Sequence, residues 1–347
     1  MTNNQIDIKC RIAVDAMGGD FAPRNEILGA VQALNESKGF ELLLVGRKDE
    51  ILQIAREENV QIDERMIIDT PDVIGMSDTP TTAIKNKPNS SLVVGAKLVK
   101  EKKADAFISA GNTGAMMAAS TLLIGRIPGV GRPAIGAPLP TNKGRFCFVF
   151  DAGSSVDCKP QHLFEYGILG SIFLKEIFGI ENPSIGLLNV GEEETKGNTL
   201  TFSSYKLLKE SKLNFYGNVE GKDILKGTTN IVLCDGFIGN IILKFGESFL
   251  TFLKTRIKNF AEGGGLINKL KALIVKSVLK DSLKDMDYQM HGGVPLLGIN
   301  GISIVGHGSS SPLAIKNMIL RAKEMYDKNL ITKFEEAIKS YAVTKEN

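Results

Sequence analysis

The sequence predicts an α/β fold built on an open, mostly parallel β-sheet with helices on both faces. The first observation is that short, nearly continuous runs of Val, Ile, Leu and Phe recur along the 347 residues, a pattern typical of parallel strands that are buried on both faces. The second is that longer helical patterns separate these runs, and such alternation favours a doubly wound sheet. In chain order, the predicted strands are 11–15 (RIAVD), 41–46 (ELLLVG), 66–69 (MIID), 104–109 (ADAFIS), 184–190 (SIGLLNV) and 230–235 (NIVLCD), and the predicted helices are 23–37, 48–58, 90–102, 113–124, 160–178, 198–211 and 310–340.

One stretch departs from this alternation. Residues 133–139 and 145–150 are both extended apolar runs, and the loop Pro140-Thr141-Asn142-Lys143-Gly144 joins them. Two such runs around a short loop that contains Gly are typical of a β-hairpin. We therefore expect an antiparallel strand, which makes the sheet mixed.

Composition and charge exclude several classes of protein. With 43% hydrophobic and 23% charged residues, the chain is not disordered, collagen-like or a disulfide-stapled miniprotein. The formal charge of +3, from 42 basic and 39 acidic residues, is too balanced for a general nucleic-acid binder. The four cysteines form no CxxC pair, so neither a zinc site nor a disulfide framework is expected. Without a signal-peptide pattern or an apolar run long enough to span a membrane, the chain is expected to be cytoplasmic.

Glycines gather where the predicted strands end. Five such turns also carry Asp, Asn, Ser, Thr or His: 15–20 (DAMGGD), 109–114 (SAGNTG), 189–191 (NVG), 235–240 (DGFIGN) and 306–309 (GHGS). The carboxyl ends of strands line the ligand crevice of open α/β sheets, and a following helix N-terminus offers free N–H groups to an anion. These turns therefore predict an anion-binding cleft, although one such turn alone is often only a tight connection. No dinucleotide or P-loop motif follows the first strand, so neither NAD nor ATP is indicated.

Together these motifs resemble the bacterial phosphate acyltransferases of glycerolipid synthesis, which make acyl phosphate from acyl-acyl-carrier-protein and orthophosphate. The resemblance runs from Arg11 to about Met325. Its segments are RIAVDAMGGD (11–20), ISAGNTGA (108–115), RPA (132–134), VDCKP (156–160), LLNVGEE and KGN (187–198), GNVEG (217–221), DGFIGN (235–240) and LLGINGISIVGHGSS (296–310). Two positions depart from the family pattern: Ile238 replaces a usual Thr, and Ser154-Ser155 replaces a usual Ala-Asn. We assign no contact to position 238.

The resemblance implies a three-layer α/β/α fold, similar to isopropylmalate dehydrogenase and phosphotransacetylase. It implies that residues 1–347 form one unit of two intertwined subdomains, with a protruding helical segment at 248–284. It also implies a homodimer that uses acyl carrier protein and orthophosphate and supplies acyl phosphate for phosphatidic acid synthesis, without cofactor or metal. A membrane glycerol-3-phosphate acyltransferase is the expected partner, and the protein is expected to be cytoplasmic and peripherally membrane-associated.

Acyl transfer from a thioester to phosphate requires binding, orientation and oxyanion stabilisation rather than a strong base. An ammonium suits phosphate, and an Asn amide can donate to an oxyanion. We therefore predict Lys196 and Asn240 as the catalytic pair. The predicted phosphate- or substrate-binding residues are Gly18, Gly19, Asp20, Gly111, Asn112, Thr113, Gly114, Lys159, Asn198, Asp235, Gly236, Lys244, His307 and Ser309.

Each assignment has a structural alternative. Lys196 would instead pair with Glu192, Glu193 or Glu194, and Lys244 would be an ordinary surface lysine. His307 would hydrogen-bond within its loop, and Ser309 or Ser310 would cap the last helix. The aspartates at 15, 20, 151 and 157 are expected to be turn formers or lysine partners. A different mechanism would make Cys158 a nucleophile that carries the acyl group.

Residues 266–284 form a basic amphipathic stretch, which Gly263-Gly264-Gly265 separates from a helix at 240–261. Its apolar stripe is Leu266, Leu270, Leu273, Ile274 and Val278, and Lys269, Lys271, Lys276, Lys280 and Lys284 lie among these residues. Residues 254–284 hold eight basic and two acidic residues. The residues alone slightly favour a dimer-interface or core helix with solvated lysines. The resemblance implies instead that this region associates peripherally with an anionic membrane, and its basic residues would equally attract an acidic acyl carrier protein.

Two other functions are alternatives. A dehydrogenase of the structurally similar superfamily would need a dinucleotide signature or clustered metal-ligand aspartates, and the sequence shows neither. A carrier-binding or membrane-adaptor protein would need no concentration of Gly, Asn and His at the strand ends.

Overall fold

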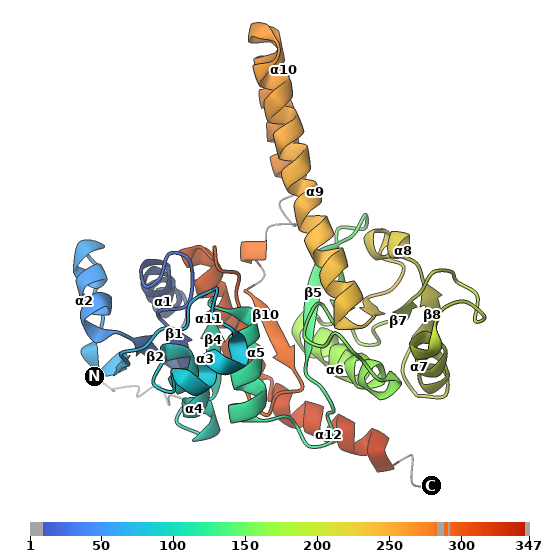
Figure 1. Cartoon of the computed structure of the whole chain (residues 1–347), viewed down its shortest axis with the longest axis horizontal. Coiled ribbons are helices and arrows are strands. Elements are labelled where there is room, and N and C mark those ends of the chain that lie inside the picture. The colour runs from blue at the N-terminus through green and yellow to red at the C-terminus, as the bar shows by residue number, and fades with distance from the viewer. Residues whose placement is uncertain (1–9, 283–287, 291, 344–347) are drawn as a thin grey trace, which may run out of the picture. The chain divides into compact units, whose positions relative to one another are not determined.

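The computed structural model of this chain describes residues 10–282, 288–290 and 292–343. The chain divides into two compact units, each built from separate stretches of sequence (Figure 1). Unit 1 comprises Met1–Gly136, Glu165–Pro183 and Tyr288–Asn347, and unit 2 comprises Ala137–Phe164 and Ser184–Asp287.

Unit 1 is built on a mixed sheet in the order β3-β2-β1-β4-β11-β10-β5. Its strands are β1 (Cys10–Asp15), β2 (Phe40–Gly46), β3 (Ile67–Asp69), β4 (Ala106–Ser109), β10 (Val294–Leu297), β11 (Ile302–Val305) and the start of β5 (Ala134–Pro140). Neighbours from β3 to β11 are parallel, whereas β10 is antiparallel to both β11 and β5.

Helices cover both faces of this sheet. They are α1 (Arg24–Glu36), α2 (Lys48–Glu57), α3 (Pro80–Asn86), α4 (Ser91–Lys100), α5 (Thr113–Ala119) with a π-helical turn (Ser120–Ile124), most of α6 (Pro160–Phe178), α11 (Pro312–Asp327) and α12 (Leu330–Val343). Phe107 of β4 lies against Gly95 of α4, and its neighbour Ile108 points to the opposite face, which α11 covers. Burying a side chain of this size contributes roughly 1.5–3 kcal/mol to stability.

Unit 2 has a parallel sheet in the order β6-β9-β7-β8. Its strands are β6 (Phe146–Phe150), β7 (Ile185–Leu188), β8 (Phe215–Val219) and β9 (Ile231–Leu233). Cys147, Val219 and Val232 belong to its buried core. Because the strands are parallel, the loops that follow them lie at one edge of the sheet.

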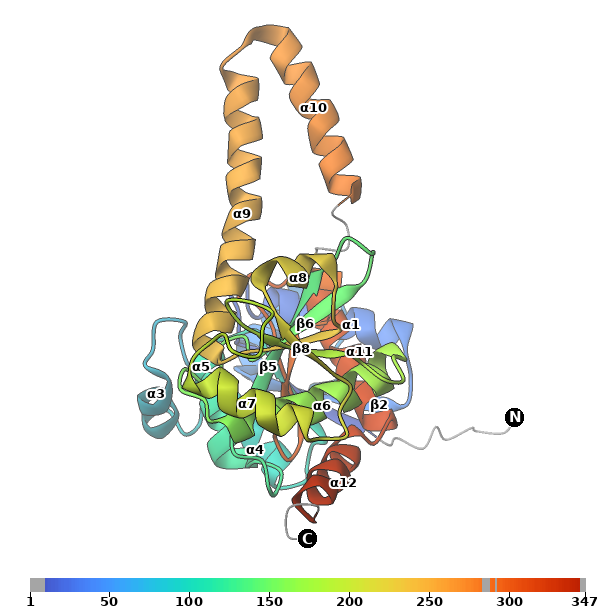
Figure 2. The ribbon, with the colours of Figure 1, turned by 90° about the vertical axis from the view of Figure 1, so that its right-hand side faces the viewer.

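The helices of unit 2 are α7 (Thr199–Lys209), α8 (Gly221–Lys226), α9 (Gly236–Glu262) and α10 (Gly265–Ser282). The last two form a helical hairpin, and Figure 2 shows them side by side. Asn268 Nδ2 donates a hydrogen bond to Phe260 O across the hairpin, at 3.2 Å. By length and composition, α9 is long and apolar enough to cross a membrane, a criterion that core helices of globular proteins also meet.

The structure confirms the predicted fold class and the hairpin at 133–150, in which Thr141 N–H donates to Arg145 O at 2.9 Å. Several boundaries were wrong. The predicted helix at 310–340 is two helices, because Asn329 has a left-handed φ of 51° that ends the first one. Strands β8 and β10 and helices α3 and α8 were not predicted, and β11 was expected only as a strand without bounds before the glycine turn at 306–309. Lys284 and the end of the predicted 248–284 segment lie outside the described residues.

Candidate active site

Three of the predicted glycine turns come together in unit 1. They follow the parallel strands β1, β4 and β11 and hold residues 15–20, 109–114 and 306–310. A Cβ on Gly111 would lie 3.2 Å from Gly18 Cα, and Asp20 N–H donates to Gly308 O at 2.7 Å. The absence of side chains at these glycines therefore allows the three turns to pack closely.

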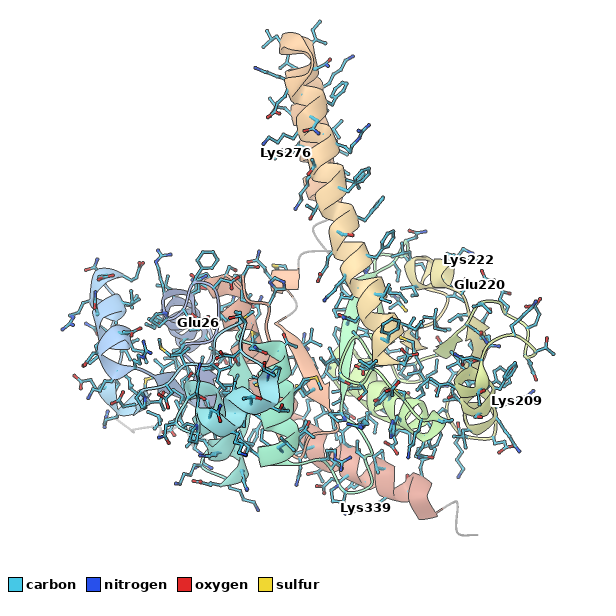
Figure 3. All side chains as sticks on the ribbon, in the orientation of Figure 1. Glu26, Lys209, Glu220, Lys222, Lys276 and Lys339 are labelled. Carbon is cyan, nitrogen blue, oxygen red and sulfur yellow. The ribbon has the colours of Figure 1, made fainter. Side chains whose placement is uncertain are left out.

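Two buried carboxyl groups lie beneath the 15–20 turn. Asp15 accepts hydrogen bonds from Ser109 Oγ at 2.7 Å and from Met17 N–H at 3.2 Å, so it is a turn former. Glu26 (Figure 3) is only 2% exposed, and its Oε1 lies 2.8 Å from the Cβ position of Gly19. Burial, followed by the nearby charge of Asp15, raises the pKa of Glu26 to about 8. The sequence patterns did not single out Glu26, because its burial depends on how α1 packs.

In the 109–114 turn, the Asn112 side chain forms hydrogen bonds within the protein. Its Oδ1 caps α5 by accepting Ala115 N–H at 3.0 Å, and its Nδ2 donates to backbone carbonyls of the 75–78 loop. Thr113 is exposed in the first turn of α5. Gly114 allows close packing on α3, because a Cβ there would lie 2.6 Å from Pro80 Cγ.

His307 lies exposed in the 306–310 turn. Ser309 N–H donates to His307 Nδ1 at 3.2 Å. Since a backbone N–H can only donate, Nδ1 is the acceptor and the ring proton of the neutral form is on Nε2. The cap of α11 is neither Ser309 nor Ser310 but Ser311, whose Oγ accepts Ala314 N–H at 3.4 Å.

In unit 2, the loop after β6 packs on the N-terminus of α9. The fully buried Asp151 carboxylate accepts Ser155 N–H at 2.7 Å and Ser154 N–H at 2.9 Å, so it too is a turn former. Gly236 N–H donates to Ser155 O at 2.8 Å. The Asn240 side chain lies 3.4 Å from the Cβ position of Gly153, which places the predicted catalytic amide beside this turn.

The N-cap and first turns of α9 carry four predicted residues: Asp235, Gly236, Asn240 and Lys244. Asp235 is the N-cap, and its Oδ1 accepts Ile238 N–H at 2.8 Å. Asn240 is half-buried, whereas Lys244, one turn further along, is exposed. Because Gly236 N–H and Ile238 N–H are already donated within the protein, what this helix end offers an anion is mainly the positive end of the helix dipole.

Lys196 lies in the loop after β7, the neighbour of β9 in the sheet. Asn189 Nδ2 donates to Lys196 O at 2.8 Å and so fixes the backbone of the loop. Glu194 pairs with Lys209 at 2.7 Å, and Glu192 lies 3.6 Å from Lys222. Figure 3 labels both lysines. Within the described residues, Lys196 forms no ion pair, so its exposed ammonium is available for a ligand.

The other two predicted residues of unit 2 have different environments. Asn198 caps α7 in a reciprocal pair with Thr201, at 2.9 and 3.0 Å, so its side chain is committed to the helix end. Lys159 is exposed, and its backbone N–H donates to His162 Nδ1 at 3.2 Å.

Comparisons with known proteins identify the family of this chain. The family model described as "Fatty acid synthesis protein" matches residues 10–333. Phosphate acyltransferase of Halothermothrix orenii is 44% identical over 323 residues, 92% of this chain and 96% of that protein. Phosphate acyltransferase of Chlorobaculum parvum is 46% identical over 327 residues, with coverages of 92% and 96%.

Solved structures share the fold at low sequence identity. A phosphotransacetylase from Streptococcus pyogenes aligns with a TM-score of 0.57 and 16% identity, covering 98% of this chain and all of that one. EutD phosphotransacetylase from Staphylococcus aureus aligns with a TM-score of 0.55 and 14% identity, with coverages of 96% and 94%. The extent of the family match and the identity to its curated relatives show that the chain belongs to the phosphate acyltransferase family.

Proposed function

We propose that this protein converts acyl-acyl-carrier-protein and orthophosphate reversibly into acyl phosphate and free carrier protein. The family supports this activity. The observation that carries the choice of residues is an exposed lysine without an ion pair in the described structure, Lys196, on a loop whose strand neighbours the strand that leads to Asn240.

In the proposed reaction, a phosphate oxygen attacks the thioester carbonyl carbon. The C–O bond forms, the C–S bond breaks, and the carrier thiolate leaves with the electron pair and takes a proton from solvent. Phosphate is largely dianionic near neutral pH, so no strong general base is needed. Lys196 would hold the phosphate by charge, and the Asn240 amide would donate to the tetrahedral oxyanion.

The remaining predicted residues have supporting roles in this proposal. In unit 2, Lys159 and Lys244 would supply positive charge for the phosphate, and Gly236 leaves the start of α9 without a side chain. In unit 1, His307 would supply an N–H donor to the donor substrate, and Gly18, Gly19 and Gly111 leave the turns open to it. Asp235 and Asn198 act through the helix ends that they cap.

The decisive assay combines the purified protein with an acyl-acyl-carrier-protein and traps acyl phosphate with hydroxylamine. Hydroxamate should form only when orthophosphate is present. Lys196→Ala and Asn240→Ala should each lower kcat by about 100-fold, as the loss of one oxyanion or phosphate donor does. Lys206→Ala, an exposed lysine on α7, is the matched control. Absence of phosphate-dependent hydroxamate from the wild-type protein would refute the proposal.

We further propose that the protein binds an anionic membrane peripherally through the basic face of α10. Leu266, Leu270 and Leu273 are 75%, 54% and 62% exposed, and Lys269, Lys271 and Lys276 lie on the same helix. A membrane glycerol-3-phosphate acyltransferase would then receive acyl phosphate at the membrane surface. Acidic carrier protein as the partner of these lysines, and a second copy of this chain on the apolar residues, are the alternatives.

A further inference from the structure

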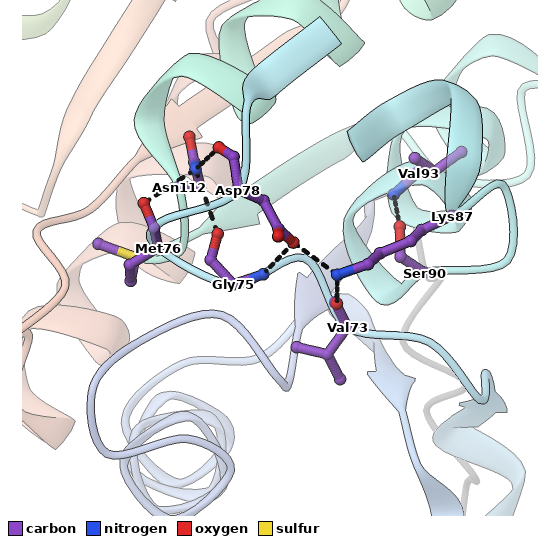
Figure 4. Close-up of polar contacts among 8 residues, drawn as sticks. All are labelled: Val73, Gly75, Met76, Asp78, Lys87, Ser90, Val93 and Asn112. Carbon is purple, nitrogen blue, oxygen red and sulfur yellow. Dashed lines mark hydrogen bonds and ion pairs between the residues drawn. The ribbon is translucent and has the colours of Figure 1, made fainter. Parts of the chain in front are cut away.

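The loop between β3 and α3 is held in place by Asn112 (Figure 4). Asn112 is 7% exposed, and its Nδ2 lies 3.2, 3.1 and 3.0 Å from the carbonyl oxygens of Gly75, Met76 and Asp78. Its Oδ1 already caps α5. The whole amide is therefore engaged by the protein, so Asn112 acts on the 73–79 loop rather than on a ligand.

A second group of contacts holds the same loop from the other side. Lys87 Nζ donates to Val73 O at 2.9 Å and to Asp78 Oδ2 at 2.5 Å, and Gly75 N–H donates to the same Oδ2 at 2.9 Å. The hydrogen bond from Lys87, followed by the one from Gly75, lowers the pKa of Asp78. The loop is thus fixed along most of its length.

Met76 lies at the centre of this fixed loop and is 53% exposed. Its Cε lies 3.0 Å from the Cβ position of Gly308, and Asp20 Oδ1 lies 3.0 Å from the same position. The fixed loop therefore presents an apolar side chain beside the turn that carries His307. Phe21, next to Asp20, is also exposed, at 57%.

We propose that Met76 contacts the acyl chain of the donor, and that Asn112 is a positioning residue for Met76; this inference rests on the proposed function. The substrate has an apolar chain next to a polar reaction centre, and Met76 offers an apolar contact next to polar turns. An unbranched thioether adapts to flexible aliphatic chains. An exposed apolar side chain on a loop that the protein fixes so thoroughly suits a binding role.

The test is a competition between two donors. Equimolar butyryl- and palmitoyl-acyl carrier protein are mixed with phosphate and enzyme, and the two hydroxamates are quantified by mass spectrometry. Met76→Ala should lower the palmitoyl-to-butyryl product ratio about fivefold, because apolar contact is lost for the longer chain. An unchanged ratio, or an equal loss for both donors as expected for a contact with the common pantetheine arm, would overturn the assignment.

Asn112→Asp tests the positioning role, because a carboxylate keeps the helix-capping acceptor but removes the donor to the three carbonyls. It should shift the product ratio in the same direction as Met76→Ala without raising the KM for phosphate. Asn86→Asp, at an exposed position on α3, is the matched control. A raised KM for phosphate with an unchanged ratio would assign Asn112 to the phosphate instead.

The failure of the proposed function and the failure of this inference are distinguishable. A wild-type enzyme without phosphate-dependent product defeats the proposed function. An active wild-type enzyme whose palmitoyl-to-butyryl product ratio is unchanged by Met76→Ala defeats this inference alone.

Discussion

At the scale of single residues, Glu26 in the candidate site of unit 1 has a pKa that its surroundings raise strongly. Its Oε2 is buried and accepts no hydrogen bond from the residues that the structure describes. The raised pKa, about 8 instead of 4.5, means that the folded protein keeps this proton at neutral pH, whereas the unfolded chain releases it.

This difference in protonation predicts how stability depends on pH. Between pH 4.5 and 8 the folded state binds more protons at Glu26 than the unfolded state, so stability falls as pH rises, by up to about 1.4 kcal/mol per unit. Glu26→Gln should remove this contribution, so its Tm relative to the wild type should rise from pH 5 to pH 8. The exposed Glu41→Gln is the control; a Tm difference for Glu26→Gln that is independent of pH would contradict the prediction.

Cys158 gives a second prediction at this scale. Its Sγ lies 3.5 Å from Ser155 O, and the proposed direct attack by phosphate leaves no role for a cysteine nucleophile. Cys158→Ala should retain kcat within about twofold, while Lys196→Ala loses it. Loss of turnover in a Cys158→Ala protein with wild-type Tm would instead support an acyl-enzyme.

The sequence predicted which residue types lie in the candidate site better than the structural role of each residue. Gly18, Gly111 and Gly236 could be identified because turns after strands need them. The capping roles of Asn112, Asn198 and Asp235 depend on where each helix begins, and a shift of a few residues in that boundary changes the role. Glu26 and Met76 could not be identified, because packing between distant segments determines their environments.

At the scale of elements, long apolar strands could be predicted clearly and short strands only weakly. Strands such as β1 and β2 are continuous apolar runs, whereas β8 (FYGNV) and β10 (VPLL) contain Gly, Asn or Pro. Their strand geometry comes from pairing with neighbours that are distant in the sequence. The break at Asn329 was missed for a related reason, since Asn adopts a left-handed conformation only where the chain requires it.

The α10 helix carries a prediction of its own. Leu270→Glu together with Leu273→Glu should lower co-sedimentation with anionic phosphatidylglycerol vesicles at least about tenfold, because apolar insertion is lost and like charge is added. Binding of the wild-type protein should weaken with salt, since Lys269, Lys271 and Lys276 contribute about 1 kcal/mol each near such a surface. Leu225→Glu, an exposed leucine of α8, is the control. Unchanged sedimentation of the double variant would refute the membrane role.

At the scale of the whole molecule, the near balance of charge conceals local asymmetry. The formal charge is only +3, yet the segment that contains α10 is strongly basic. Large apolar side chains on α9 and α10 are exposed. Their exposed fractions range from 41% for Ile238 to 75% for Leu266. Apolar surface of this extent is typical of a contact site for a membrane or another protein.

The predicted homodimer is tested by light scattering. The wild-type protein should have twice the chain mass of 37.6 kDa over a wide range of concentration. The Leu270→Glu, Leu273→Glu variant should keep that mass if the stripe serves the membrane. A wild-type monomer would refute the dimer, and a monomeric variant of a dimeric wild type would assign the stripe to the subunit interface.

The position of β11 between β4 and β10 has a consequence for biosynthesis. When the ribosome has made the first four strands, β4 still lacks the neighbour that closes its side of the sheet, and that neighbour is nearly 200 residues away in the sequence. Unit 2 is complete before this strand emerges. The nascent chain must therefore keep an apolar strand edge open through most of its synthesis, an interval in which such edges are prone to wrong pairing.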